Sequence, residues 1–135
     1  MEIQKCHEWY VSERGTFLSI DHFSSMIMML PATMVACSDG DFDELEKQNL
    51  ANSCKEIDAN EHVGFEVYAE LCHLVGANAA DQRSKVLDCI KTELSKDASN
   101  GELIVEMMTE MADSSDGISS TEAAKISEIR NMLSI

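Results

Sequence analysis

The sequence predicts an all-α protein, a compact bundle of about seven helices, on the basis of three observations. Apolar residues recur three or four positions apart along most of the chain, which is the period of one face of a helix. Aromatic residues make up only 5% of the chain while methionine occurs 9 times, a composition that suits a soft aliphatic core and gives little support to strands. Glycine, serine, asparagine and aspartate stand between the apolar stretches, where helices end and begin.

The length of the chain bounds the number of domains. With 135 residues, of which 44% are hydrophobic, the chain is long enough to bury one sizeable core. We therefore expect residues 1–135 to form a single helical domain.

Two helices are expected in the N-terminal part. The first covers Ile3–Arg14 and ends before Gly15, and the second covers Ile20–Cys37. Pro31 interrupts the second, because proline removes one helical hydrogen bond and clashes with the preceding turn. The helix should kink there or restart with Pro31 in its first turn, and the apolar run on both sides favours a buried, kinked helix.

Five further helices are predicted from apolar spacing and from capping residues. The third begins after Asp43, the sixth near Ser99 in a Ser-x-x-Glu pattern, and the seventh after Ser119. The residues expected to face inward are Leu50, Cys54 and Ile57 in the third helix; Val63, Val67, Leu71 and Leu74 in the fourth; Val86, Leu87, Ile90 and Leu94 in the fifth; Leu103, Ile104, Met107, Met108 and Met111 in the sixth; and Ile126, Ile129, Met132 and Leu133 in the seventh.

The charge of the chain restricts its partners. The formal net charge is -15, from 25 acidic against 10 basic side chains, and such an excess makes a self-repelling negative field. Nucleic acid and anionic membrane surfaces are therefore excluded as expected partners, whereas cations and basic protein surfaces remain.

The location is predicted from the absence of two signals. The N-terminal residues lack the basic and then apolar order of a signal peptide, and the most apolar run, around Met26 to Cys37, is too short to cross a bilayer. We expect a cytoplasmic protein without direct membrane insertion.

The five cysteines indicate buried, reduced thiols. They are odd in number, widely spaced and contain no Cys-x-x-Cys pair, so neither a disulfide framework nor a thiolate zinc site is predicted.

One motif occurs twice. Residues 34–40 read MVACSDG and residues 111–117 read MADSSDG, and each copy has a glycine at the turn, a capping residue and a glutamate three residues after the cap. In the first copy these are Gly40, Asp43 and Glu46, and in the second they are Gly117, Ser119 and Glu122. The glycine permits a positive φ where the first helix stops, and the cap and glutamate satisfy amides at the start of the next helix.

Capping does not account for Asp39 and Asp116, which follow the negative end of the preceding helix. Further acids lie beside them, namely Asp41, Asp43 and Glu44 in the first copy and Asp113 in the second. Carboxylates gathered in this way favour binding of a hard cation by oxygen ligands.

The repeated segments resemble the tellurite-resistance TerB family, whose members carry a helix, a Ser-Asp-Gly turn with acids and a Glu-Lys-bearing helix twice per domain. Residues 38–47, SDGDFDELEK, look like one copy, and residues 115–122, SDGISSTE, look like the other. The resemblance spans the chain from about Phe23 onward.

The resemblance implies about seven helices with a pseudo-twofold repeat, a negatively charged face, and a divalent cation, calcium or similar, bound at the two turns. Carried over by position, the metal ligands would be Asp39, Asp43, Glu46, Asp116 and Glu122. The family is linked to tellurite, phage and chemical stress phenotypes, and its domains act beside membrane and enzymatic partners.

Other sites were weighed against these residues. An EF-hand needs a glycine and a glutamate where this chain has Glu44 and Leu50, so it is excluded. Glu70 and His73 have the spacing of di-iron ligands, but the chain lacks a second such pair. The methionine clusters at 26–29 and 107–111 suit a soft metal or an adaptable partner surface, although core packing explains them better. No nucleophile with a base stands out, so no catalytic residue is assigned.

The sequence therefore predicts a non-enzymatic acidic helical module of TerB type that binds a divalent cation at the paired Asp-Gly turns. It would mediate protein interactions in a stress-resistance or phage-related setting. The alternative is a metal-independent acidic adaptor or inhibitor that docks a protein partner with a basic surface.

Overall fold

The predicted all-α bundle is confirmed. The structure, a computed structural model, describes residues 1–38, 43–113 and 117–135, and these contain seven α-helices, one 3₁₀ helix and no strand. The elements are α1 (Ile3–Arg14), α2 (Ile20–Ala36), α3 (Glu44–Lys55), α4 (Glu61–Leu74), η1 (Ala77–Ala79), α5 (Ala80–Lys96), α6 (Ser99–Ala112) and α7 (Ser120–Leu133).

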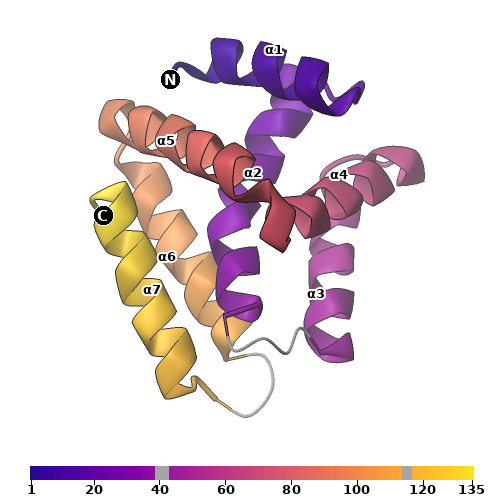
Figure 1. Cartoon of the computed structure of the whole chain (residues 1–135). Helices are drawn as coiled ribbons and strands as arrows, with labels where there is room; N and C mark the ends of the chain where they lie inside the picture. The colour runs from indigo at the N-terminus through magenta and orange to yellow at the C-terminus, as the bar shows by residue number, and fades with distance from the viewer. Residues whose placement is uncertain (39–42, 114–116) are drawn as a thin grey trace.

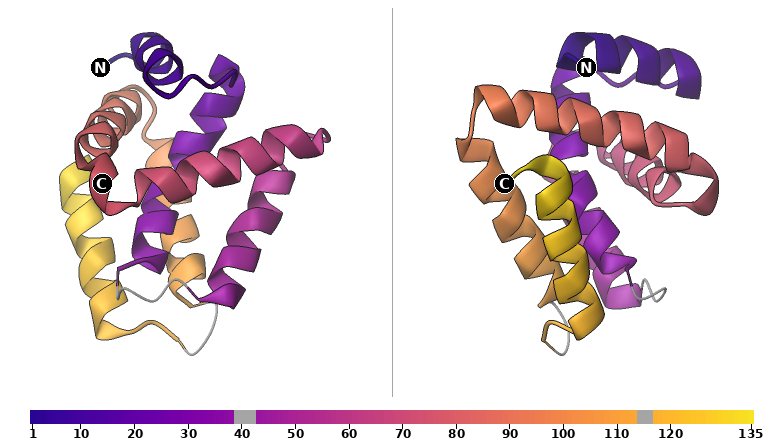
Figure 2. Two further views of the ribbon diagram at one scale, coloured as in Figure 1. Left: turned by 45° about the vertical axis from the view of Figure 1, so that its right-hand side comes forward. Right: turned by 60° about the vertical axis from the view of Figure 1, so that its left-hand side comes forward.

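Helix α2 runs through the middle of the molecule, and the other helices pack around it (Figure 1). Helix α6 lies along α2, α7 contacts α2, α5 and α6, and α3 packs mainly on α4. Helices α1 and α5 cross one end of the bundle. At the opposite end, α2 and α6 finish and α3 and α7 begin (Figures 1 and 2). We call this end the turn pole.

Helix α2 continues through Pro31 and does not restart there. It spans Ile20–Ala36, and most of its residues are buried, Pro31 included. The burial of apolar side chains on both sides of the proline offsets the cost of about 3 kcal/mol that a proline imposes inside a helix. The Thr33 hydroxyl donates to the Met29 carbonyl at 2.8 Å, which adds a local bond around the proline turn.

Most residues predicted to face inward lie in the core, but Leu103 and Met132 do not. Leu103 is 48% exposed and Met132 is 42% exposed. Each stands beside a fully or nearly buried residue, Ile104 and Leu133, and adjacent residues on a helix point about 100° apart. The core-facing stripes of α6 and α7 are therefore narrower than the apolar pattern indicates.

The predicted capping box at Ser99 is wrong. Ser99 is the first residue of α6 itself, and the residue before it, Ala98, makes no side-chain cap. Asp97 takes this role from outside the helix, since its Oδ1 accepts hydrogen bonds from the Ser99 amide at 3.1 Å and the Ser99 hydroxyl at 2.6 Å.

Gly64 allows α4 to cross closely over α3. A Cβ at this position would lie 3.1 Å from the Cys54 carbonyl oxygen and 3.2 Å from the Lys55 Cα, and backbone atoms cannot move aside cheaply. A glycine that is unfavourable within a helix is thus explained by packing.

All five cysteines are free thiols, as predicted. Cys6, Cys54 and Cys89 are buried, whereas Cys37 and Cys72 are only partly buried. Burial raises the pKa of the Cys54 thiol to about 12. Among the helices that the structure describes, none is long and apolar enough to span a membrane.

Candidate functional site

The turn pole holds both predicted capping boxes. At the start of α3, Asp43 Oδ1 accepts the Glu46 amide at 2.8 Å, and Glu46 Oε1 accepts the Asp43 amide at 3.4 Å. At the start of α7, Ser119 Oγ accepts the Glu122 amide at 3.1 Å, and Glu122 Oε1 accepts the Ser119 amide at 3.0 Å. The structural roles assigned to these four residues are confirmed.

The two copies of the motif come together in space. Ser38, just after α2, lines the same surface hollow as Ser120 and Thr121 at the start of α7. Gly117 has a φ of 86°, the left-handed conformation that the motif requires of a glycine. The copies nevertheless have different surroundings, because α3 packs on α4 while α7 packs on α5, α2 and α6.

The capping boxes use three of the five predicted metal ligands. Asp43, Glu46 and Glu122 each commit a carboxylate oxygen to a cap, and Glu46 and Glu122 are only 6% and 8% exposed. Asp39 and Asp116 lie outside the described residues. Within residues 1–38, 43–113 and 117–135, no three histidine, cysteine or acidic side chains form a group that could hold a metal. The cation site remains a prediction.

Glu70, the acid of the Glu-x-x-His pattern, lies in a buried ion pair. Its Oε1 accepts Arg14 Nε at 2.7 Å and the Tyr10 hydroxyl at 2.7 Å, and its Oε2 accepts Arg14 Nη2 at 3.1 Å. His73 instead contacts Gln82, with 2.6 Å between Nε2 and Oε1. The bonds from Tyr10 and Arg14 fasten α1 to α4, and Glu70 and His73 have different hydrogen-bond partners.

This arrangement also sets the pKa values of the group. Burial pushes the pKa of the Glu70 carboxyl upward, but the hydrogen bonds from Arg14 and Tyr10 and the charge of Arg14 outweigh it, so the net pKa is below its usual value. Burial, and then the bond to Glu70, raise the pKa of the Tyr10 hydroxyl.

Helix α6 carries an uninterrupted row of acids. Glu102, Glu106 and Glu110 are spaced four residues apart and share one side of the helix, Asp113 follows as its C-cap, and all four are exposed. We call this row the acidic stripe. Helix α6 has no lysine or arginine, and in the described part of the chain none of the four acids takes part in an ion pair.

Like charges four residues apart destabilise a helix by a few tenths of a kcal/mol per pair. Repulsion along the acidic stripe is therefore unfavourable for α6, except that Glu102 lies in its first turn, where the helix dipole favours a negative charge.

A groove lined by methionine runs beside the acidic stripe. It consists of two hollows that meet at Met107, one of about 320 Å³ between α2, α3 and α6 and one of about 360 Å³ between α2, α5 and α6. Their methionines are Met28, Met29, Met107 and Met111. We call the two hollows together the methionine groove.

The charged residues of the methionine groove are all acidic. Glu56 and Glu110 line the first hollow and Glu93 lines the second, and among the described residues no lysine, arginine or histidine lines either. Glu110 belongs to the acidic stripe as well, and it is the member of the stripe that lines the groove among the described residues, whereas Glu102 lines a different hollow.

Two other hollows differ in charge. The hollow between α3 and α4, about 1190 Å³, has both signs, with Glu44 and Glu61 against Lys47 and Lys55. It is less suited than the methionine groove to a partner whose charges are all of one sign.

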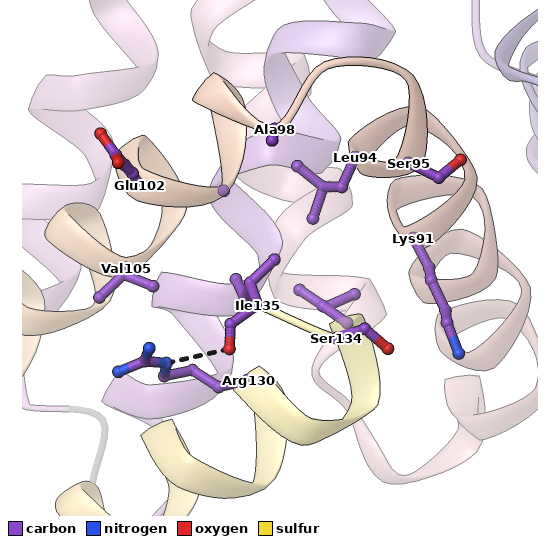
Figure 3. Close-up of a pocket in the computed structure, with 11 residues that line it drawn as sticks. Lys91, Leu94, Ser95, Ala98, Glu102, Val105, Arg130, Ser134 and Ile135 are labelled. Carbon is purple, nitrogen blue, oxygen red and sulfur yellow. Dashed lines mark hydrogen bonds between the residues drawn. The ribbon is translucent and has the colours of Figure 1, made fainter.

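The remaining hollow, about 550 Å³, lies between α5, α6 and α7 and has both signs of charge, with Lys91 and Arg130 against Glu102 of the acidic stripe (Figure 3). Ile135 occupies its middle, where Arg130 Nε donates to the Ile135 carbonyl oxygen at 3.4 Å. A Cβ on Gly101 would lie 3.0 Å from Ile135 Cγ2. The chain itself therefore fills part of this hollow.

No family model, curated protein or solved structure matches this chain. Membership of the TerB family accordingly remains a prediction based on the two repeated motifs.

Sequence reasoning missed the acidic stripe and the methionine groove. The stripe has a visible signal, four acids at helical spacing in a segment without lysine or arginine. For the groove the sequence shows the two methionine clusters, which were assigned mainly to core packing, because the hollows themselves depend on how α3 and α5 sit against α2 and α6.

Proposed function

We propose that this protein is a non-enzymatic, cytoplasmic acidic adaptor that docks a protein partner with a basic surface and needs no metal to do so. The observation that supports this function is the acidic stripe on α6, which is exposed, unpaired within the described residues and unfavourable for folding. A row of carboxylates without a structural role suits a basic surface, which it attracts over distances of about 8–10 Å at physiological salt.

The described carboxylates support docking better than metal binding. The four acids of the stripe lie side by side on the surface, whereas three of the predicted metal ligands are already used in capping boxes. Docking through the stripe requires no change in any hydrogen bond that the structure shows.

Binding to a ten-residue lysine peptide tests the adaptor. We expect saturable binding by the full chain that persists in a chelator and weakens steeply between 50 and 200 mM salt, on the order of tenfold or more. Isothermal calorimetry with and without chelator measures both effects.

Two double variants locate the contact. Glu106→Gln with Glu110→Gln should weaken peptide binding at least about fivefold, since it removes two charges from the stripe. Glu8→Gln with Glu13→Gln, exposed acids of α1, removes the same charge and should change binding less than about twofold. Equal losses in both variants, or no binding at low salt, would contradict the proposal.

A second candidate function is cation binding of TerB type at the turn pole, in a stress-resistance or phage-related setting. It is favoured by the proximity of the two motif copies, since Ser38 lies in one hollow with Ser120 and Thr121. Calcium or a similar divalent ion would bind there through Asp39 and Asp116, the two acids that capping does not explain.

Calorimetry with calcium, magnesium, manganese and zinc separates this candidate from the first. Saturable binding that Asp39→Ala with Asp116→Ala abolishes would support it, with Asp21→Ala as an exposed control. Absence of saturable binding, or binding that the double variant leaves unchanged, would exclude cation binding at the turn pole. Neither result would contradict the proposed adaptor function.

A further inference from the structure

We infer that the methionine groove binds a basic amphipathic helix presented by the partner protein. The inference rests on the proposed adaptor function and adds to it the place of docking, the secondary structure of the partner segment and the pattern of its side chains.

The shape of the groove matches a helix of about three turns. On α6 the lining residues run from Asn100 through Leu103 and Met107 to Met111, at spacings of three or four, and on α2 they run from Ser24 to Ala32. The rise from Asn100 to Met111 is about 16 Å, which is the length of three turns of a helix laid alongside. An apolar strip with residues at positions i, i+3, i+4 and i+7 fills such a groove.

The chemistry of the lining favours an adaptable contact. Methionine is unbranched and polarisable, so it reshapes around an incoming side chain at little cost. Met28, Met107 and Met111 are partly buried and Leu103 is 48% exposed, which leaves apolar surface for a ligand to cover. Met29, which is 7% exposed, forms the floor.

The charges around the groove specify a basic partner. The acids that line it are Glu110, which belongs to the acidic stripe, Glu56 and Glu93. Glu93 also faces Lys96, at 3.8 Å, and accepts the Ile3 amide at 3.3 Å, so it is partly neutralised, whereas Glu56 and the stripe have no ion pair in the part of the chain that the structure describes. Lysine or arginine flanking the apolar strip of the partner would meet these carboxylates.

A second copy of this chain is a poor occupant. Self-association through this face would bring two acidic stripes together, and like-charge juxtaposition at an interface costs several kcal/mol. The absence of basic residues from the lining therefore argues for a different protein.

The probe is a 16-residue amidated peptide with leucine at i, i+3, i+4 and i+7 of successive turns and lysine elsewhere. A scrambled peptide of the same composition is the matched control, since it has the same charge but no apolar face. We expect the amphipathic peptide to bind at least about tenfold more tightly and to gain helix content on binding, as measured by calorimetry and circular dichroism.

Two single variants test the groove. Leu103→Gln removes an exposed apolar side chain of the lining without changing charge, and should weaken the amphipathic peptide about fivefold to tenfold while leaving the lysine peptide unaffected. Leu45→Gln is the control, because Leu45 is similarly exposed, at 44%, and lines neither hollow.

Methyl NMR of the nine methionines gives a direct readout. The signals of Met28, Met107 and Met111 should shift on titration with the amphipathic peptide, and that of Met132 on α7 should not.

The outcomes separate the two proposals. Equal affinity for the amphipathic and scrambled peptides, or methyl shifts confined to methionines outside the groove, would contradict helix binding in the methionine groove. Neither result would contradict the acidic adaptor. Failure of every basic peptide to bind at low salt would overturn both.

Discussion

At the scale of single residues, Glu70 is the buried charge that joins distant parts of the chain. It is 7% exposed and receives Arg14 in a two-pronged ion pair together with the Tyr10 hydroxyl, 60 residues away in sequence. The ion pair is partly buried, since the Arg14 side chain is 28% exposed, so removing the Glu70 charge leaves a guanidinium that water compensates only in part.

Glu70→Gln should therefore destabilise the protein by about 2–4 kcal/mol, since Arg14 loses its counter-charge and one of its acceptors. Urea unfolding measures the change. Glu8→Gln, an exposed acid on the same helix as Arg14, should stay within about 0.5 kcal/mol of the original protein. A loss of similar size in both variants would contradict the role assigned to Glu70.

The pH dependence of this effect follows from the lowered pKa of Glu70. In the unfolded chain the pKa of the Glu70 carboxyl is about 4.5, and in the folded protein it is lower. The charged carboxylate therefore contributes fully to folding stability above pH 4.5, and this contribution is lost as the pH falls through the folded pKa. The difference in unfolding free energy between the original protein and Glu70→Gln should be constant from pH 6 to 7 and shrink progressively below about pH 5. A difference that grew on acidification would exclude this assignment.

The sequence predicted the hydrogen-bond partner of a residue correctly where that partner is near in sequence. It failed where the partner or the burial of the residue depends on how several helices pack. The partners of Asp43 and Ser119 lie three residues away, and both were identified correctly. The partners of Glu70 lie on α1, and no pattern around position 70 indicates them. Leu103 and Met132 were misplaced because spacing alone does not set the width of a buried stripe.

At the scale of helices, the starts of α3 and α7 are held by reciprocal hydrogen bonds rather than by extensive burial of their own first turns. In each case a cap side chain and a glutamate satisfy amides that the helix leaves without an internal partner. Both helices should therefore respond to cap substitution more than to changes at exposed positions nearby.

Asp43→Ala and Ser119→Ala should each cost about 1 kcal/mol, and Asp43→Asn only a few tenths, because asparagine accepts the same amide bond. Thermal unfolding of the three variants measures this order. Asn and Ala variants of equal stability at position 43 would show that the cap contributes nothing. The same comparison matters for any metal test, since substitutions at Asp43 or Glu122 change stability whether or not a cation binds.

Apolar periodicity and capping residues predicted the positions of the helices in the sequence well, but they did not predict how the helices pack against one another. The bounds of α1 were predicted correctly, and α2 ends one residue before the predicted position. The Ser99 capping pattern failed because Asp97 offers a carboxylate that competes for the same amide. The methionine clusters were expected mainly in the core, because the groove that they line needs α3 and α5 placed on either side of Met107.

At the scale of the whole molecule, the net charge of -15 is the main determinant of the electrostatics of the surface. Within the described residues seven acids take part in ion pairs, so most of the negative charge of the 25 acids repels itself across the surface. The same excess that suits a basic partner thus weakens the folded state in the absence of one.

The melting temperature should therefore rise by roughly 3–5 °C between 10 and 150 mM sodium chloride at pH 7, corresponding to about 1 kcal/mol. Differential scanning fluorimetry checks this, and the Glu106→Gln, Glu110→Gln variant should show a smaller rise, because it has less repulsion to screen. A melting temperature that stays constant or falls over this range would mean that attractive pairs outweigh the repulsion.

The attachment of α1 has a consequence for how the chain is made. Besides Tyr10 and Arg14, which contact Glu70, the helix presents Ile3 to Glu93 and Trp9 to Lys85. At about 5–20 residues per second, synthesis of the chain between α1 and these partners takes several seconds. Helix α1 therefore gains its full set of contacts only after α4 and α5 have been synthesised, although α2, whose Phe23 ring packs on Tyr10, can cover part of its buried face earlier.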